Sequence, residues 1–150
     1  MYLTAIIDVY SRYILGWHIG NSLEAEVSSN LLKECVLNYG APHIINSDQG
    51  SQYTSSLWKE TVKKFDIKIS MDGKGRALDN IWIERFWRTL KRGYVYLNPA
   101  ENGTDLYHGL KKYIAYYNTQ RGHTSLGGYP PARCSITKYR RQKRRKNEKK

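Results

Sequence analysis

Two short apolar runs separated by a polar turn open the chain. Residues 2–7 are rich in strand-forming side chains, and residues 13–19 form a second run of the same kind. Apolar runs of this length predict strands. Asp8 starts the polar turn between them, where an aspartate side chain can bond to its own backbone. The opening pattern therefore predicts an antiparallel hairpin.

The pattern then alternates between helical and strand spacing. Apolar residues recur at helical spacing over residues 27–36, with Asn21-Ser22 as a candidate N-cap and Gly40 as a stop. The elements that follow are a strand at residues 43–47, a helix over residues 57–65 with Leu57 in its apolar stripe, and a strand at residues 67–71. Strands that alternate with helices predict an α/β domain with a mixed sheet.

The strongest helical pattern begins near residue 79. Its apolar stripe consists of Trp82, Ile83, Phe86, Trp87, Leu90 and Tyr94. Glu84, Arg88 and Lys91 share a neighbouring face because they are spaced i, i+4 and i+7. An acid at the border of the core could bind a metal, and the two cations after it could contact backbone phosphates. An exposed ion pair between Glu84 and Arg88 explains the pattern equally well.

A last helix is predicted to begin with Thr104 as its N-cap. Residues 116–131 then read as a loop-like segment rich in aromatic and basic groups, among them Arg121 and His123. Aromatic rings beside cations suit a DNA-facing surface. Tyrosines near helix ends are, however, more often half-buried packing groups.

Charge changes the picture of possible partners. The 150 residues hold 25 Lys+Arg against 13 Asp+Glu, a net charge of +12. Much of this excess lies in residues 138–150, which are expected to form a disordered basic tail after a core of residues 1–137. Such a balance predicts binding to DNA or RNA through phosphate neutralisation. The alternative is a tail that only improves solubility.

The cysteine and hydropathy patterns indicate the cellular compartment but predict no disulfide or metal site. Cys35 and Cys134 lack the number and spacing of a disulfide scaffold or a zinc site. No apolar run approaches membrane-spanning length, and the start is not a signal peptide. The chain is therefore expected in a reducing, cytoplasmic compartment, with no membrane partner.

Two acids are candidates for metal-dependent phosphoryl transfer. Asp48 follows the predicted strand at residues 43–47, at the sheet edge where α/β folds bind ligands. Glu84 lies on the charged face of the helix that begins near residue 79. Phosphoryl transfer needs carboxylates that converge on hard cations, whereas the spacing of two acids is by itself a weak signal. The chain shows no nucleophile elbow, Gly-rich phosphate loop or zinc pattern.

Four short sequence motifs along the chain are more specific indicators of function. They are Leu3-Thr4-Ala5-Ile6-Ile7-Asp8-Val9-Tyr10-Ser11-Arg12 with Gly16-Trp17, Asn46-Ser47-Asp48-Gln49-Gly50-Ser51-Gln52-Tyr53, Asp79-Asn80 through Glu84 to Lys91, and Tyr117-Asn118 with Arg121, His123, Ser125-Leu126-Gly127 and Pro131. In this order they resemble the bacterial insertion-sequence transposases of the DDE superfamily, whose catalytic core is related to retroviral integrase.

The resemblance implies an RNase H-like mixed sheet flanked by helices, with Mg²⁺ or Mn²⁺ as cofactor. It implies DNA strand cleavage and strand transfer on transposon ends and target DNA, in bacterial cytoplasm at the nucleoid. By motif match, Asp48 and Glu84 would be the second and third metal ligands and catalytic residues. Arg88 and Lys91 fall where related integrases contact the DNA backbone, and the C-terminal signature makes Arg121 and His123 expected DNA contacts.

The chain departs from the family pattern in two places. Gly122 stands where the family commonly has Pro. The family's first catalytic Asp lies on a strand, within a Trp-x-x-Asp-x-Thr motif. The matching position in this chain would precede Met1. The fold is thus expected to lack its first, central strand, and the chain alone to be unstable and inactive. Asp8 is expected to form a turn rather than replace the absent acid.

Two functions remain open from the sequence. The first is a transposase catalytic-core fragment. The second is a non-catalytic DNA-binding or regulatory remnant, which binds DNA or assembles with further copies of itself or with an intact transposase.

Overall fold

The computed structural model describes residues 1–71 and 80–134. Its elements in chain order are β1 (Tyr2–Ile7), β2 (Ile14–Gly20), α1 (Ala25–Tyr39), β3 (Ile44–Ser47), α2 (Ser51–Thr54), α3 (Ser56–Lys64), β4 (Lys68–Met71), α4 (Ile81–Leu90), the π-helical turn η1 (Lys91–Val95), α5 (Gly103–Thr119) and the 3-10 turn η2 (Thr124–Leu126). The loop predicted at residues 72–76 and the tail at 138–150 lie outside the described residues. In the described ranges, every helix is too short or too polar to serve as a membrane-crossing segment.

The four strands form two pairs. β1 and β2 are antiparallel, with Ile6 opposite Gly16, as the hairpin prediction requires. β3 and β4 are parallel, with Ile45 opposite Ile69. Among the described residues each pair is a separate two-stranded sheet, so the expected mixture of parallel and antiparallel strands is present without one continuous ladder.

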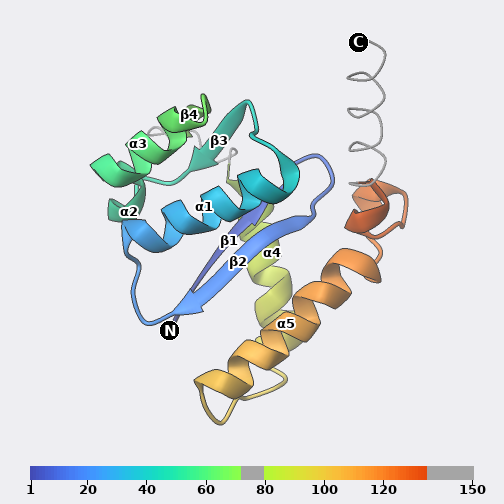
Figure 1. Ribbon diagram of the computed structural model, residues 1–150. Coiled ribbons are helices and arrows are strands. Elements are labelled where there is room, and N and C mark those ends of the chain that lie inside the picture. The colour runs from blue at the N-terminus through green and yellow to red at the C-terminus, as the bar shows by residue number, and fades with distance from the viewer. Residues whose placement is uncertain (72–79, 135–150) are drawn as a thin grey trace.

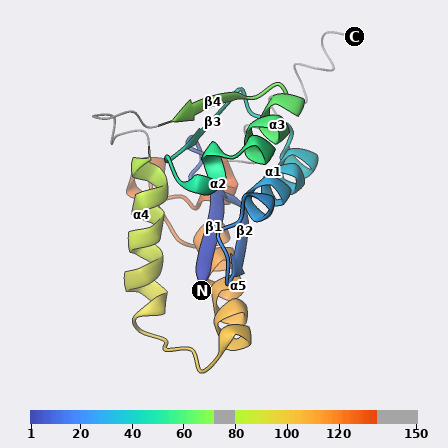
Figure 2. The same ribbon diagram turned by 90° about the vertical axis from the view of Figure 1, so that its left-hand side faces the viewer.

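The hairpin is the middle layer of the molecule. Leu3 and Ile7 pack against the α4–α5 core, whose buried residues are Ile14, Phe86, Leu90, Leu110, Ile114 and Tyr117. Ile6 packs against the α1–α3 core, whose buried residues are Leu32, Trp58, Val62 and Ile67. Successive strand residues point to opposite faces. Figures 1 and 2 accordingly show α1 on one face of the hairpin and α4 on the other.

A glycine in β2 sets how closely α1 approaches the hairpin. A Cβ atom at Gly16 would lie 2.7 Å from Sγ of Cys35 and 2.9 Å from Cδ1 of Leu31. These contacts are too short for a side chain, so Gly16 permits the packing. Burial raises the pKa of the Cys35 thiol to about 11, and the neutral thiol packs as a small apolar group.

Local polar contacts shape the turn of the hairpin. Oδ2 of Asp8 accepts hydrogen bonds from Ser11 N at 3.1 Å and Ser11 Oγ at 2.6 Å. Arg12 N donates to the Asp8 carbonyl at 2.7 Å, with Arg12 in the left-handed region at φ 64°. The turn-forming role predicted for Asp8 is therefore confirmed.

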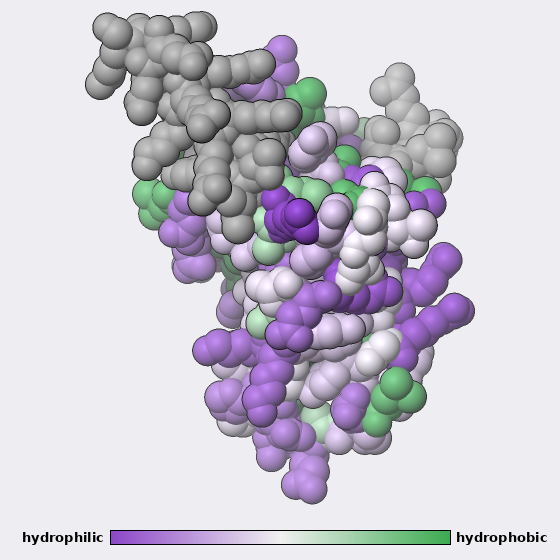
Figure 3. Space-filling model, turned by 90° about the vertical axis from the view of Figure 1, so that its right-hand side faces the viewer, coloured by the Kyte–Doolittle hydropathy of each residue, from purple (hydrophilic) through white to green (hydrophobic). Residues whose placement is uncertain are grey.

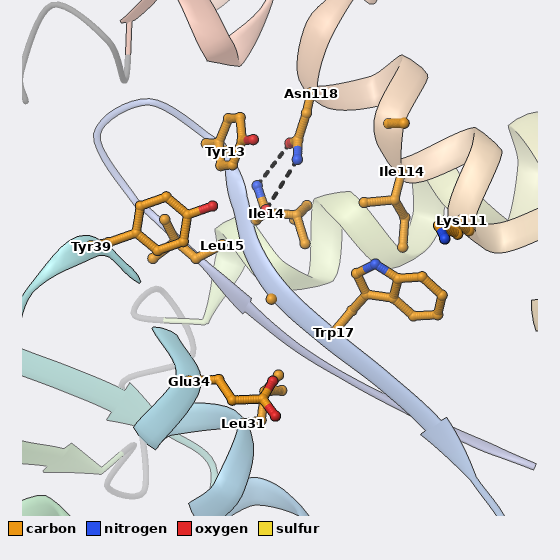
Figure 4. Close-up of a pocket in the computed structure, with 12 residues that line it drawn as sticks. Tyr13, Ile14, Leu15, Trp17, Leu31, Glu34, Tyr39, Lys111, Ile114 and Asn118 are labelled. Atoms are coloured by element: carbon orange, nitrogen blue, oxygen red, sulfur yellow. Dashed lines mark hydrogen bonds between the residues drawn. The ribbon is translucent and has the colours of Figure 1, made fainter. Parts of the chain in front are cut away.

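Asn118 ties the end of α5 to β2 (Figure 4). Its Oδ1 accepts from Ile14 N at 2.9 Å and its Nδ2 donates to Ile14 O at 3.0 Å. The side chain is 6% exposed. A buried backbone N–H and C=O without hydrogen-bond partners cost free energy. The Asn118 amide bonds both groups of Ile14 and so takes the place of a neighbouring strand at this position of β2.

Three local expectations are wrong. Glu24, not Asn21-Ser22, is the N-cap of α1, because the helix begins only at Ala25. Asn102, not Thr104, caps α5, since its Oδ1 accepts from Asp105 N at 2.9 Å. In α3, Trp58 is buried while Leu57 is 41% exposed, because the helix turns Trp58 and Val62 toward the α1–α3 core.

We expect Asn118→Ala to lower the free energy of unfolding by about 2–4 kcal/mol, because both polar groups of Ile14 lose their buried partner. Asn98→Ala is the matched control: its exposed Nδ2 donates to Tyr94 O at 2.9 Å, and its loss should cost below about 1 kcal/mol. Urea unfolding of both variants measures the difference. Equal losses would contradict the role assigned to Asn118.

Candidate active site

Asp48 lies directly after β3, the strand paired in parallel with β4. Its side chain is exposed, and its Oδ1 accepts a hydrogen bond from Gly50 N at 2.8 Å. A Cβ atom at Gly50 would lie 2.9 Å from that same Oδ1. The turn into α2 therefore holds this carboxylate at the carboxyl end of a parallel strand, the edge at which such sheets bind ligands.

Glu84 lies in the first turn of α4 and is exposed. Phe86 and Leu90, at 1% and 2% exposure, fix the rotation of the helix. Helical spacing then turns Glu84, Arg88 and Lys91 outward together, and all three are exposed. Lys91 keeps α-helical angles at φ −61° and ψ −50°, so the predicted shared face is present.

Trp82 differs from its predicted place in the apolar stripe. The Arg12 guanidinium carbon lies 3.4 Å from the centre of the Trp82 ring, and that of Arg85 lies 5.0 Å from it. The ring is thus a platform for two cations. The Arg12 stack links the hairpin turn to the helix that carries Glu84.

Arg121 and His123 follow the end of α5. The Arg121 guanidinium carbon lies 6.0 Å from the Tyr117 ring centre, and the His123 ring meets Tyr117 edge-on at 4.8 Å. Burial, with the charges of Arg121 and Arg12, lowers the pKa of His123. The lowered pKa favours the neutral imidazole when no anion is bound.

Apart from Asp48, which follows β3, the predicted site residues fall into two sets. Glu84, Arg88 and Lys91 share the outward face of α4 and η1. Arg121 and His123 instead lie beside the Tyr117 ring at the end of α5. The sequence signal for this second set was the C-terminal signature. No sequence pattern identified Arg12, Trp82 and Arg85 as neighbours.

The donor types fit a hard cation. Mg²⁺ is usually bound by one or two carboxylates together with water and substrate phosphates, and Asp48 and Glu84 are exposed carboxylates on different elements. Within residues 1–71 and 80–134, no group of three or more acidic, His or Cys side chains could hold a metal. Asp8 is engaged in its own turn through Ser11.

A pocket beside β2 does not belong to this site. It lies between α1 and α5 and is lined by residues that include Tyr13, Trp17, Glu34, Lys111 and Asn118, as Figure 4 shows. None of the predicted site residues lines it. The face that carries α5 is largely hydrophilic where the described residues are visible (Figure 3).

Comparison with known proteins gives consistent matches. Two models described as integrase core domain match residues 1–77 and 65–131. The transposase for insertion sequence element IS904 of Lactococcus lactis is 38% identical over 133 residues, covering 84% of this chain and 51% of the relative. Transposase InsF for insertion sequence IS3A of Escherichia coli is 28% identical over 134 residues, covering 87% and 46%. The chain spans about half the length of these curated relatives.

Solved structures share the fold. The catalytic core domain of BIV integrase matches with a TM-score of 0.75 at 16% identity, covering 93% of this chain and 88% of that one. The HTLV-2 integrase catalytic core domain in complex with magnesium matches with a TM-score of 0.68 at 18% identity, covering 89% and 83%. The predicted RNase H-like fold is confirmed. The chain belongs to the integrase core domain family, with insertion-sequence transposases among its relatives.

Proposed function

We propose that this chain is part of a transposase that cleaves and transfers DNA strands by metal-dependent phosphoryl transfer. The observation that carries the proposal is the exposed face of Glu84, Arg88 and Lys91, held on α4 by apolar packing. It pairs an acid able to bind a metal with two cations able to bind the DNA backbone. Asp48, at the carboxyl end of β3, supplies the second acid.

Asp48 and Glu84 would hold Mg²⁺ or Mn²⁺. When bound, the metal activates the attacking oxygen and stabilises the leaving oxygen. Arg88 and Lys91 neutralise phosphates along one line of α4 and η1, which orients the strand. Arg121 and His123 contact the DNA from the end of α5.

The proposed transposase role also suggests an oligomeric assembly and a cellular location. The HTLV-2 integrase core has been solved in trimeric and dimeric forms, which supports assembly with a second copy or with an intact transposase. A protein acting on transposon ends and target DNA works at the bacterial nucleoid, in the cytoplasm.

A second function is favoured by one observation. Arg88 and Lys91 are exposed, and cations of this kind neutralise DNA phosphates without any metal or strand cleavage. Such a chain would regulate transposition by occupying DNA or by assembling with intact transposase.

Glu84→Gln separates the two functions. If the chain cleaves, nicking of duplex DNA in Mn²⁺ should fall at least about 100-fold in this variant, because a lost metal ligand removes several kcal/mol of transition-state stabilisation. DNA affinity should be retained. Glu60→Gln, an exposed acid on α3, is the matched control and should nick normally. Salt-sensitive binding without any nicking by the native chain would instead support the regulatory function.

Arg88→Ala and Lys91→Ala should each weaken binding to duplexes of any sequence. Each should also reduce the slope of log K against log[salt] by about one, because one phosphate contact and its released counterion are lost. Fluorescence anisotropy over a salt series measures the slope. Lys59→Ala on α3 removes the same charge from another element, and a loss of slope as large as that of Arg88→Ala would refute a specific role for this face.

A further inference from the structure

The edge of β2 that faces away from β1 borders a groove between α1 and α5. In the described ranges β2 pairs with β1 alone, so this edge has no neighbouring strand. A hollow of about 360 Å³ lies beside it (Figure 4), and a second hollow of about 370 Å³ adjoins the first along α1. Trp17, Leu31 and Glu34 line both hollows. We name the two hollows together the β2 groove.

The bottom of the β2 groove is apolar, and its backbone edge is partly open. Ile14, Leu31 and Ile114 line it and are 3%, 5% and 3% exposed. Asn118 bonds to the main chain of β2 at Ile14, and in residues 1–71 and 80–134 no strand follows the rest of this edge. An extended segment can dock beside an unpaired strand edge of this kind, through main-chain hydrogen bonds and apolar contacts.

Acidic side chains form the rim of the β2 groove on the α1 side. Glu26 and Glu34 lie about two turns apart on α1, and Glu24 directly precedes this helix. All three are exposed and line the groove. The opposite wall carries Lys111 on α5, and Figure 4 shows Glu34 and Lys111 on the two sides of β2. Three carboxylates against one ammonium group make this rim negative, whereas the whole chain has a net charge of +12.

The sequence contains a segment of opposite charge and sufficient length. Residues 138–150 hold nine Lys and Arg side chains and one Glu. Asn118, which lines the groove, lies next to the end of α5, and Figure 1 shows residues 120–134 beside that end of the helix. The sixteen residues after Cys134 can extend over about 50 Å, which is about twice the length of the 17-residue α5. The segment can therefore reach along the whole groove.

From this complementarity we propose that the β2 groove binds residues 138–150 of the same chain when no DNA is present. The basic side chains lie beside Glu24, Glu26 and Glu34, and the main chain follows the open edge of β2. DNA phosphates attract the same basic side chains, so DNA and the groove compete for the segment. The groove thereby regulates DNA binding, because the segment must leave the groove before it adds to the affinity. This inference requires binding to DNA but neither a metal nor strand transfer.

Zero-length cross-linking tests the contact in the native full chain. A carbodiimide joins a Lys amine to a Glu carboxylate only where the two groups touch. Cross-links from residues 138–150 should reach Glu26 or Glu34, and duplex DNA should reduce them at least about fivefold because phosphates occupy the cations. Glu60 on α3 and Glu101 before α5 are exposed comparison acids. Equally frequent cross-links to these two, or none to the groove acids, would overturn the proposal.

Isotope labelling identifies which copy of the chain supplies the segment. In a mixture of ¹⁵N-labelled and unlabelled protein, the two halves of each cross-linked peptide pair should carry the same label, as a contact within one chain requires. Pairs that join a labelled half to an unlabelled half would instead place the segment of a second copy in the groove, and would overturn the contact within one chain.

A pair of substitutions tests the regulation. Glu26→Gln with Glu34→Gln should tighten binding to duplex DNA about fivefold, the effect of two exposed ion pairs that no longer hold the segment. Glu60→Gln with Glu101→Gln is the matched control, since it removes the same charge elsewhere, and it should change the affinity less than about twofold. Fluorescence anisotropy measures both. Equal changes in the two double variants, or no change in the groove variant, would overturn the regulation.

These measurements are independent of the proposed strand transfer. Neither cross-linking nor anisotropy involves nicking, so a chain that binds DNA without cutting it would contradict the proposed transposase activity and leave the groove contact as it is. Loss of the cross-links in a chain that nicks DNA would overturn the groove contact alone.

Discussion

The burial of Phe86 and Leu90 against the hairpin is the constraint on which the functional surfaces depend. These two side chains are almost fully buried, and they allow α4 a single rotation about its axis. The 3.6-residue period then places every other side chain of the helix. Glu84 faces solvent with Arg88 and Lys91, and Trp82 meets Arg12. The position of the acid is thus a consequence of apolar packing elsewhere on the same helix.

The hairpin has a matching role on the other side of this interface. Its alternating side chains serve the α4–α5 core and the α1–α3 core at once, so displacement of either layer strains the other. Polar contacts hold the turn and the outer edge of the hairpin. Asp8 and Ser11 shape the turn, and Asn118 closes the edge of β2 at Ile14. The turn in that shape presents Arg12 to Trp82.

Two kinds of basic surface follow from this arrangement. On the outward face of α4 the cations are fully solvated beside an acid, so their attraction for phosphates is strong only at low salt. Beside Trp82, Arg12 is half-buried and Arg85 is exposed. Both cations lie over the same ring, which restrains their geometry. The first suits general attraction to anions, and the second holds the hairpin turn against α4.

Periodicity along the chain was enough to predict the hairpin, the principal helices, the outward face of α4 and the place of Asp48 after a strand, because these depend on neighbours within a few residues. The caps of α1 and α5 and the place of Leu57 in α3 were mispredicted, since several residues can serve locally and packing selects one. Asn118 bonds to Ile14 across 104 residues, and Arg12 stacks on Trp82 from another element. No local pattern contains such pairs, and only the packing of α4 and α5 on the hairpin brings them together.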